Sequence, residues 1–359
     1  MKNIILILTV LFMGCSPIIE KSGNKSNTID NITDNLSINQ KIGQFLCLGF
    51  EDKEYNKNVE NLLKTYTPGS IILFGRNVDN KDQLTSLIKD IRELYDSLKL
   101  PKPFIFVDEE GGRVSRLKNL EGEINSASWY FNNSNSKEYA TNIVNRLKKY
   151  NINSPLSPVL DICEPSENVI GDRSFTNDTD KAISFIKDIL KVYKENKILS
   201  VGKHFPGHGS TEVDSHFDLP VINMDFNDFK NKHIKPYIEL KDDLDAVLVA
   251  HLMYPSVDDQ FPTSLSKKWI TDILLNDIKF NGLVLSDDLT MEALNKYGNL
   301  SDRVVKFLEA GGDIALVCHP TDQLENIQKA LNNLYNTNKE QMDKSLKKII
   351  NKKYDILYK

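Results

Sequence analysis

The segment GLVLSDD (282–288) joins an unbroken apolar run to a pair of carboxylates. Consecutive apolar residues, rather than apolar residues alternating with polar ones, indicate a strand buried on both faces, as in a parallel sheet covered by helices. The two carboxylates then stand at the point where such a strand leaves the core. This combination of a buried strand and ionisable groups at its end recurs along the chain.

Seven further segments have the same apolar character, and we predict a strand in each of them: IGQFLCLGF (42–50), GSIILFG (69–75), PFIFVDEE (103–110), NSPLSPVLDIC (153–163), ILSVGKHF (198–205), AVLVAHL (246–252) and DIALVCHP (313–320). Amphipathic stretches with helical periodicity lie between them, for example at 81–99, 179–197 and 266–279. Eight β–α units in roughly 320 residues predict an α/β fold, a (β/α)8 TIM barrel that forms a single catalytic domain. A doubly wound open sheet is the alternative, although no G-x-G-x-x-G motif follows the first strand.

The bulk composition is that of a globular protein of one large unit. The 359 residues are 40% hydrophobic and 26% charged, with a formal net charge of −5 and a pI near 5.8. Lysines and arginines are spread along the chain rather than gathered in a stripe with aromatic residues. We therefore predict that the protein does not bind nucleic acid.

The N-terminal segment MKNIILILTVLFMGC (1–15) has the features of an export signal. A lysine precedes an apolar run, Ile4 to Met13, that is too short to span a bilayer as a helix. The ending LFMGC resembles a bacterial lipobox, although Phe12 stands where leucine is usual, and predicts that Cys15 is lipidated and becomes the new N-terminus. An ordinary cleaved signal is the alternative. Residues 16–36 are polar and predict a flexible tether, so we expect an exported protein that is lipid-anchored to a bacterial membrane.

The sequence gives little support for a metal site. The cysteines other than Cys15 lie in or beside apolar runs without C-x-x-C spacing, and we expect buried free thiols at Cys47, Cys163 and Cys318. His204 and His208 have the i, i+4 spacing of a helical zinc motif, but Pro206 and Gly207 between them exclude a regular helix. We predict no metal and no cofactor.

Ionisable residues gather at the ends of the predicted strands. Those of interest are Asp108, Glu109, Glu110, Lys203, His204, His251, Asp287, Asp288 and His319. In a TIM barrel the C-terminal ends of all strands open on one face, where active sites are built. Chance placement would spread such groups over the helices and over both faces. This convergence predicts an enzyme.

The loop KHFPGHGSTEVDSH (203–216) contains three of the six histidines. More than twenty residues separate the fifth strand from the helix expected near Asn227, and long loops in compact domains are usually functional. Asp214 and His216 are two residues apart, so in an extended segment both side chains point to the same side. A carboxylate that accepts from one imidazole nitrogen raises the basicity of the other, and the pair can then exchange a proton near neutral pH.

Two other motifs offer groups for a substrate. Asp287 in LSDDLTM (285–291) emerges from an apolar strand and is a candidate nucleophile, metal ligand or substrate anchor, whereas Asp288 is expected to cap the next helix. VDEEGGRVSR (107–116) joins an acidic cluster to two arginines across a Gly-Gly turn, which is typical of carbohydrate recognition. An internal salt-bridge lattice is the alternative for Glu110 and Arg113. Arg173 in IGDRSF (170–175) lies on the loop after the fourth strand and is also expected to reach a ligand.

Taken together, KHFPGHG-x4-DSH, VDEEGGRVSR, IGDRSF and LSDDLTM resemble glycoside hydrolase family 3, in its single-domain β-N-acetylglucosaminidase (β-hexosaminidase) branch. The resemblance places the family domain at 37–359. It implies a TIM barrel that hydrolyses terminal non-reducing β-linked N-acetylglucosamine with retention of configuration. It also implies that Asp287 is the nucleophile and His216 the acid/base, oriented by Asp214. The sugar-binding residues that it implies are Asp108, Arg116, Arg173, Lys203 and His204.

Two other functional classes remain open on the sequence. One is a β-N-acetylglucosaminide phosphorylase, because a neutral histidine does not repel incoming phosphate as a carboxylate would. The other is a glycan-binding lipoprotein that does not cleave its ligand. We expect a monomer whose partners are a small N-acetylglucosamine-containing oligosaccharide, from cell-wall muropeptides or chitin, and a membrane reached through the lipid anchor.

Overall fold

The computed structural model describes residues 25–163, 169–210, 219–319 and 322–358. The predicted signal 1–15, with Cys15, therefore lies outside the described residues. Within the described ranges, no helix is both long enough and apolar enough to cross a membrane.

All eight predicted strands are present and parallel. Each predicted segment contains one of them: β1 (Leu46–Leu48), β2 (Ser70–Leu73), β3 (Phe104–Val107), β6 (Ser154–Pro155), β7 (Val201–Phe205), β8 (Ala246–Val249), β9 (Leu283–Ser286) and β10 (Ala315–Val317). They form one sheet in the order β10-β1-β2-β3-β6 and another in the order β7-β8-β9. Apart from β10 beside β1, neighbours in space are also neighbours along the chain.

Backbone hydrogen bonds also link the two sheets to each other. On the β6 side, the amide of Val201 donates to the carbonyl of Ser157 at 2.8 Å. On the β9 side, the amide of Ser286 donates to the carbonyl of Ile314 at 3.1 Å, and an isolated parallel bridge joins Leu285 to Ile314. The strands are buried on both faces, as the unbroken apolar runs predict: Phe104 to Val107 of β3 are fully buried.

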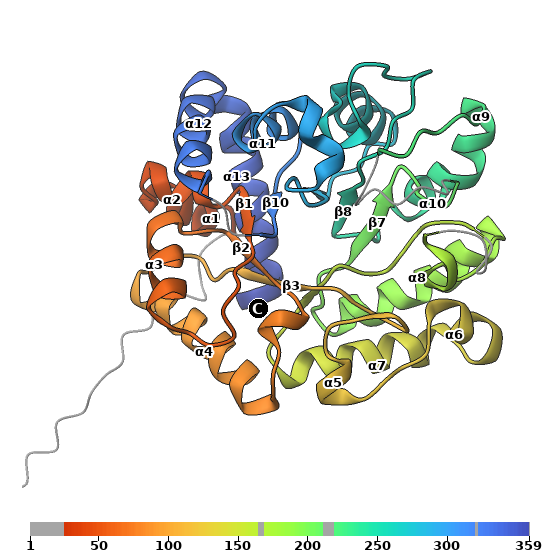
Figure 1. Ribbon diagram of the computed structural model, residues 1–359, viewed down its shortest axis with the longest axis horizontal. Helices are drawn as coiled ribbons and strands as arrows, with labels where there is room; N and C mark the ends of the chain where they lie inside the picture. The colour runs from red at the N-terminus through yellow and green to blue at the C-terminus, as the bar shows by residue number, and fades with distance from the viewer. Residues whose placement is uncertain (1–24, 164–168, 211–218, 320–321, 359) are drawn as a thin grey trace, which may run out of the picture.

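Helices surround the strands (Figure 1). The α-helices are α1 (Lys25–Asn35), α2 (Ile38–Gly43), α3 (Lys57–Tyr66), α4 (Lys81–Ser97), α5 (Lys118–Glu121), α6 (Ala127–Asn133), α7 (Ser136–Lys149), α8 (Thr179–Glu195), α9 (Phe226–Phe229), α10 (Lys235–Leu240), α11 (Leu300–Glu309), α12 (Leu324–Thr337) and α13 (Lys339–Lys353). Short 3-10 turns occur at η1 (Gly75–Asn77), η2 (Gly171–Arg173), η4 (Thr263–Leu265) and η6 (Glu292–Tyr297), and π-helical segments at η3 (Lys230–Ile234), η5 (Lys268–Asp277) and η7 (Tyr354–Tyr358). The amphipathic stretches 81–99 and 179–197 are α4 and α8, and 266–279 contains η5.

Helix α4 shows how the sequence produces this packing. Asn80 caps it by accepting from the amide of Gln83 at 3.0 Å, which satisfies a donor that has no partner within the helix. The buried side chains recur at helical spacing and form one apolar stripe: Leu84, Leu87, Ile88, Ile91, Leu94 and Tyr95. Burying each such side chain contributes about 1.5–3 kcal/mol, which ties the helix to the strands beneath it.

The predicted tether 16–36 needs correction over its second part. Residues 25–35 form helix α1, which buries Ile29 and lies beside α13 (Figure 1). Lys25 pairs with Asp355 at 2.7 Å, and Lys347 pairs with Asp30 at 2.7 Å. The stretch suggested a tether because most of its residues are polar. Its few apolar residues nevertheless recur at helical spacing, and the stretch forms a helix. Residues 16–24 lie outside the described part.

A lysine is buried at the N-terminal ends of the strands. Lys353 of α13 is fully buried, and its Nζ donates to Oε1 of Gln44, just before β1, at 2.7 Å. The ammonium also lies 5.7 Å from the ring centroid of Phe104, the first residue of β3. No carboxylate among the described residues is within ion-pair distance, and burial lowers the pKa of Lys353 to about 7.

Candidate active site

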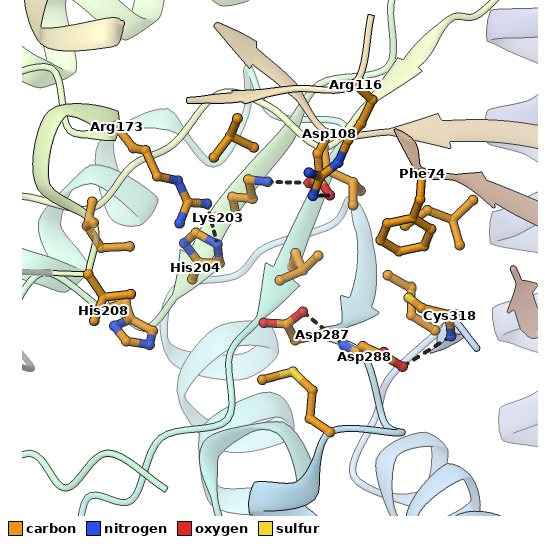
Figure 2. Close-up of a pocket in the computed structure, with 18 of the residues that line it drawn as sticks. Phe74, Asp108, Arg116, Arg173, Lys203, His204, His208, Asp287, Asp288 and Cys318 are labelled. Atoms are coloured by element: carbon orange, nitrogen blue, oxygen red, sulfur yellow. Dashed lines mark hydrogen bonds and ion pairs between the residues drawn. The ribbon is translucent and has the colours of Figure 1, made fainter. Parts of the chain in front are cut away.

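A cavity of about 230 Å³ opens at the C-terminal ends of the strands. Six residues predicted from sequence to bind or react with substrate line it together: Asp108, Arg116, Arg173, Lys203, His204 and Asp287. Four of them lie after β3, β6 or β9, whereas Lys203 and His204 lie within β7, and Figure 2 shows all six converging on one space. Asp288, His208 and His319 also line the cavity. The predicted convergence at the strand ends is therefore confirmed for most of these groups.

Lys203 and Asp108 form the centre of a charge network. Lys203, in the middle of β7, donates to Oδ1 of Asp108 at 2.9 Å, while Arg116 donates to Oδ2 of the same carboxylate at 3.1 Å (Figure 2). Burial alone would raise the pKa of Asp108, but the charges of Lys203 and Arg116 outweigh it and hold the pKa well below its usual range. Asp108 is thus a fixed anion, able to accept from sugar hydroxyls.

Glu110 holds two cations from behind the cavity wall. Both of its oxygens accept from Arg173, at 2.8 and 2.9 Å, and Oε1 lies 2.5 Å from Nζ of Lys203. Burial would raise the pKa of Glu110, but Arg173 and Lys203 lower it to about 2. The salt-bridge alternative for Glu110 is therefore correct, and the carboxylate fixes the positions of two residues that face the cavity.

A second buried carboxylate, Asp161, orients the histidines of the loop after β7. Its Oδ2 lies 2.6 Å from Nδ1 of His204, and its Oδ1 accepts from the amide of His208 at 2.6 Å. Nε2 of His204 lies 3.3 Å from Nη2 of Arg173, which can only donate. This pattern assigns the His204 proton to Nδ1. Burial raises the pKa of Asp161, but His204 and His208 bring it down to about 2.

Asp287 and Asp288 have different surroundings although they are neighbours in sequence. Asp288 caps the following turn: its Oδ2 accepts from the hydroxyl of Thr290 at 2.6 Å and its Oδ1 from the amide of Cys318 at 3.1 Å. Asp287 accepts from the amide of Asp288 at 2.8 Å, and its carboxylate stands in the middle of the cavity (Figure 2). The second carboxylate thus holds the loop in place, and the first faces the cavity.

Two groups of the predicted cluster, Glu109 and His251, and Arg113 of the VDEEGGRVSR motif do not line the cavity. Glu109 is fully buried and pairs with Arg146 at 2.6 Å, away from the cavity. His251 is also fully buried, and its Nε2 lies 2.9 Å from the carbonyl of Asp288, so it supports the loop rather than a ligand. Arg113 is half-exposed and pairs with Asp172 at 3.1 Å, in agreement with the salt-bridge alternative.

The glycines after β7 serve packing. Gly207 has a φ of +135°, and a Cβ at Gly209 would lie 2.3 Å from the carbonyl oxygen of Ile162. Glycine at these two positions therefore permits a positive φ and a close approach to other parts of the protein. Residues 211–218 are outside the described part, so the predicted catalytic pair, Asp214 and His216, is not placed relative to Asp287.

The sequence reasoning missed two cavity features. Asp161 lies inside the run SPVLDIC (157–163), where a lone carboxylate between apolar residues was the available signal. Phe74, after β2, lines the cavity, stacks on His319 with ring centroids 5.9 Å apart, and lies 5.7 Å from the guanidinium carbon of Arg116. Nothing in the run GSIILFG (69–75) separates this aromatic residue from core residues.

Comparison with known proteins matches residues 37–352 to the model of the family described as Glycosyl hydrolase family 3 N terminal domain. The chain belongs to glycosyl hydrolase family 3. A Beta-hexosaminidase from Tolumonas auensis is 35% identical over 282 residues, which cover 76% of this chain and 82% of the relative.

Solved structures agree with this family assignment. The family 3 beta-N-acetylglucosaminidase from Paenibacillus sp. str. FPU-7 has a TM-score of 0.84 and 27% identity, over 89% of this chain and 62% of that one. NagZ from Neisseria gonorrhoeae, in complex with N-trifluoroacetyl-D-glucosamine, has a TM-score of 0.71 and 29% identity, over 83% of this chain and 89% of that one.

The family 3 cavity provides fixed charges and one carboxylate, Asp287, that faces the ligand space. Within the described ranges, no group of three or more histidine, cysteine, aspartate or glutamate residues is placed to hold a metal ion. Cys47, Cys163 and Cys318 are free and buried, as predicted. What the described groups can do is hold a polar, hydroxyl-rich ligand and present a carboxylate to it.

Proposed function

We propose that this chain is a retaining exo-β-N-acetylglucosaminidase. The observation that carries the proposal is the position of Asp287, in the same cavity as the Asp108–Lys203–Arg116 network and the Arg173–His204 pair. Membership of glycosyl hydrolase family 3, and relatives named Beta-hexosaminidase, support it. We also infer that the eight parallel strands close into a (β/α)8 barrel, since hydrogen bonds link the two sheets on both sides.

The sugar is held by groups whose charges are already fixed. The Asp108 carboxylate accepts from ring hydroxyls, while Arg116 and Lys203 donate to hydroxyl oxygens. Arg173 and His204 lie beside each other, 3.3 Å apart, and receive the other side of the ring with its attached amide. Because Glu110 and Asp161 hold these side chains before the substrate arrives, little free energy is lost in ordering them.

The bond-breaking step uses Asp287 and His216. A carboxylate oxygen of Asp287 attacks the anomeric carbon and forms a glycosyl ester, while His216, oriented by Asp214, gives a proton to the departing oxygen. His216 then takes a proton from water, whose oxygen attacks the same carbon and releases Asp287. Two inversions give net retention of configuration. Most retaining enzymes use a second carboxyl for the proton, and here an imidazole takes that place.

The substrate follows from the size and chemistry of the cavity. About 230 Å³ is below the range of about 300–1,000 Å³ typical of sites for larger ligands, which suits one terminal sugar. We propose terminal non-reducing β-linked N-acetylglucosamine on oligosaccharides of the cell-wall (muropeptide) or chitin type. We further propose that Cys15 is lipidated and holds the enzyme, as a monomer, on the outer side of a bacterial membrane.

A trapping experiment tests the reaction. A slow fluorinated N-acetylglucosaminide should add the mass of one sugar to the peptide that contains Asp287, and fragmentation should place it on that residue. Label on Asp288, or no label while a chromogenic N-acetylglucosaminide is still hydrolysed, would contradict the proposed nucleophile. Product analysis with and without phosphate distinguishes hydrolysis from phosphorolysis, and no turnover of any substrate would leave a glycan-binding protein.

Labelling with a fatty-acid probe tests the anchor separately. Cells that make the wild-type chain should show a labelled protein, and cells that make Cys15→Ser should not. Equal labelling of both, or of neither, would exclude lipidation at Cys15.

A further inference from the structure

A second hollow, of about 310 Å³, lies at the opposite end of the strands from Asp287. It is bordered by the segments that lead into β3, β6 and β7, so it opens at their N-terminal ends. Its charged lining side chains are all basic, and we call it the basic pocket: Arg92, Lys102, Lys148 and Lys197. None of its described lining residues is acidic, although the chain as a whole has a formal net charge of −5.

Arg92 is the deepest of these cations and lacks part of its hydrogen bonding. Its Nη2 donates to the carbonyl of Asn151 at 2.9 Å, but its Nε is buried and has no hydrogen-bond partner among the described residues. Burial lowers the pKa of Arg92. A buried guanidinium N–H without an acceptor is costly, and an anion in the pocket would supply the acceptor.

The lysines around Arg92 come from different segments. Lys148, near the end of α7, is held by Oδ1 of Asn196 at 2.7 Å, and Lys197 follows α8. Lys102, before β3, lies 3.4 Å from Asp96, a carboxylate that does not line the pocket. Among the described residues, four cations thus line the hollow and one carboxylate lies at its edge.

The basic pocket lies on the side where the chain enters the described structure. Ile356 and Leu357 of η7 contribute to its lining. Asp355, directly before them, pairs at 2.7 Å with Lys25, the first described residue. Cys15, the proposed site of the anchor, lies ten residues earlier in the sequence. The anchor belongs to the proposed function, whereas the pocket does not depend on it.

We propose that the basic pocket binds a phosphate group, carried either by a free phosphate compound or by the headgroup of an anionic phospholipid. A phosphate offers several strong acceptor oxygens and more than one negative charge, which match a guanidinium surrounded by ammonium groups. Its oxygens would accept hydrogen bonds from Arg92 and from lysines that come from three different segments.

Two matched double variants test the pocket. Lys148→Gln/Lys197→Gln removes two exposed cations of the pocket, and Lys191→Gln/Lys194→Gln removes two exposed cations from α8 outside it. Both changes alter net charge equally and spare buried side chains, so both proteins should fold, which circular dichroism verifies. The thermal midpoint is measured in inorganic phosphate, in glycerol phosphate and in sodium chloride of equal ionic strength. Sedimentation with phosphatidylglycerol vesicles uses the same variants in a Cys15→Ser background.

A free phosphate ligand predicts a saturable rise in midpoint in the wild type and the α8 control, with an apparent affinity weakened about 10-fold or more in Lys148→Gln/Lys197→Gln. A lipid headgroup predicts that vesicle binding is weakened to the same degree in that variant only. The proposal is overturned if neither phosphate nor vesicles separates the two double variants. Hydrolysis of a chromogenic N-acetylglucosaminide should be equal in all of them, so loss of the pocket and loss of the proposed reaction are distinguishable.

Discussion

Two buried lysines stand at opposite ends of the parallel strands. Lys203 is 2% exposed at the C-terminal end, and Lys353 is 0% exposed at the N-terminal end. Burial lowers the pKa of both, but Asp108 and Glu110 more than compensate at Lys203, whose pKa is raised. At Lys353 the hydrogen-bond acceptor is the neutral amide oxygen of Gln44, and burial lowers the pKa to about 7.

The difference shows what burial costs with and without a partner of opposite charge. At the C-terminal end the charges are paired, so they remain in place over the whole physiological pH range and can receive a polar ligand without rearranging. At the N-terminal end, burying the charged form of Lys353 lowers the stability of the folded protein, and the size of this penalty depends on pH. Lys203 is therefore part of a charge network at the cavity, whereas Lys353 is buried among core side chains. Variants at both ends test this difference.

The first prediction concerns the reacting carboxylate at the C-terminal end. Asp287→Ala should lower kcat on the order of 10⁴-fold while the unfolding midpoint changes little, because the side chain is replaced where it faces a cavity. Added azide should restore part of the rate and give the α-glycosyl azide, since the azide attacks from the side that Asp287 occupied. Azide product of β configuration, or activity near wild type, would contradict the assignment.

The second prediction concerns the proton donor. It tests whether the charge network that holds the sugar can support glycosylation without His216. His216→Ala should lower the glycosylation rate about 10²–10⁴-fold for substrates with poor leaving groups, which need a proton as the bond breaks. An activated aryl glycoside should lose less at that step and show a pre-steady-state burst, because water is no longer deprotonated efficiently. Lys203→Ala should weaken both substrates to a similar degree, since both carry the same sugar. If His216→Ala lowered the glycosylation rate equally for both kinds of substrate, His216 would not be the acid.

The third prediction uses two adjacent buried glutamates. Glu110→Gln leaves Lys203 and Arg173 without one of their carboxylates and should lower kcat/KM about 10-fold, with destabilisation of about 3–5 kcal/mol. Glu109→Gln disrupts the pair with Arg146 and should cost similar stability while kcat/KM of the folded protein stays near wild type.

The dependence of stability on acidic pH gives a second measurement for these two variants. The pKa of Glu110 is lowered to about 2 in the folded protein, so its contribution to stability is complete above the unfolded pKa of about 4.5 and is lost as pH falls toward 2. Glu110→Gln should therefore flatten the loss of stability between those values. If both substitutions reduce kcat/KM equally, Glu110 has no special positioning role.

The smallest effect on activity is expected at Lys353. Its folded pKa of about 7 is below the unfolded value of 10.5, so the unfolded state binds the proton more tightly and stability should rise between pH 7 and 10. Lys353→Met should flatten this rise by up to about 1.4 kcal/mol per pH unit. Lys352→Met, one residue earlier and paired with Asp245 at 2.7 Å, should keep the wild-type slope. Denaturant titrations across this range measure both, and equal slopes in all three proteins would exclude a proton change at Lys353.

The sequence was informative where one local pattern decides the structure. Each of the eight apolar runs contains a strand, and carboxylates such as Asp108 and Asp287 follow from their place at strand ends. It was misleading where a polar stretch hides a sparse apolar stripe, as in α1. The sequence also did not separate Glu109 from Glu110, because their roles depend on their partners in space, Arg146 for Glu109 and Arg173 with Lys203 for Glu110.

Asp161 shows a further limit. Its role depends on His204 and His208, which lie more than forty residues away along the chain. Nothing local to the run SPVLDIC (157–163) reveals that the loop after β7 will pack against it. Contacts of this kind arise only from the tertiary arrangement of the strands.

The pairing of β1 with β10 has a consequence for synthesis of the chain. Leu46 is in register with Ala315, so the first strand acquires its second neighbour only when nearly all of the protein has left the ribosome. A nascent chain that stops before Ala315 exposes one edge of β1 and leaves α1 without α13 to pack on. Contacts between such distant segments slow folding, and an open strand edge invites association with other chains. Folding of the sheet therefore waits for β10, and we expect truncations that remove β10 to aggregate rather than yield a smaller stable domain.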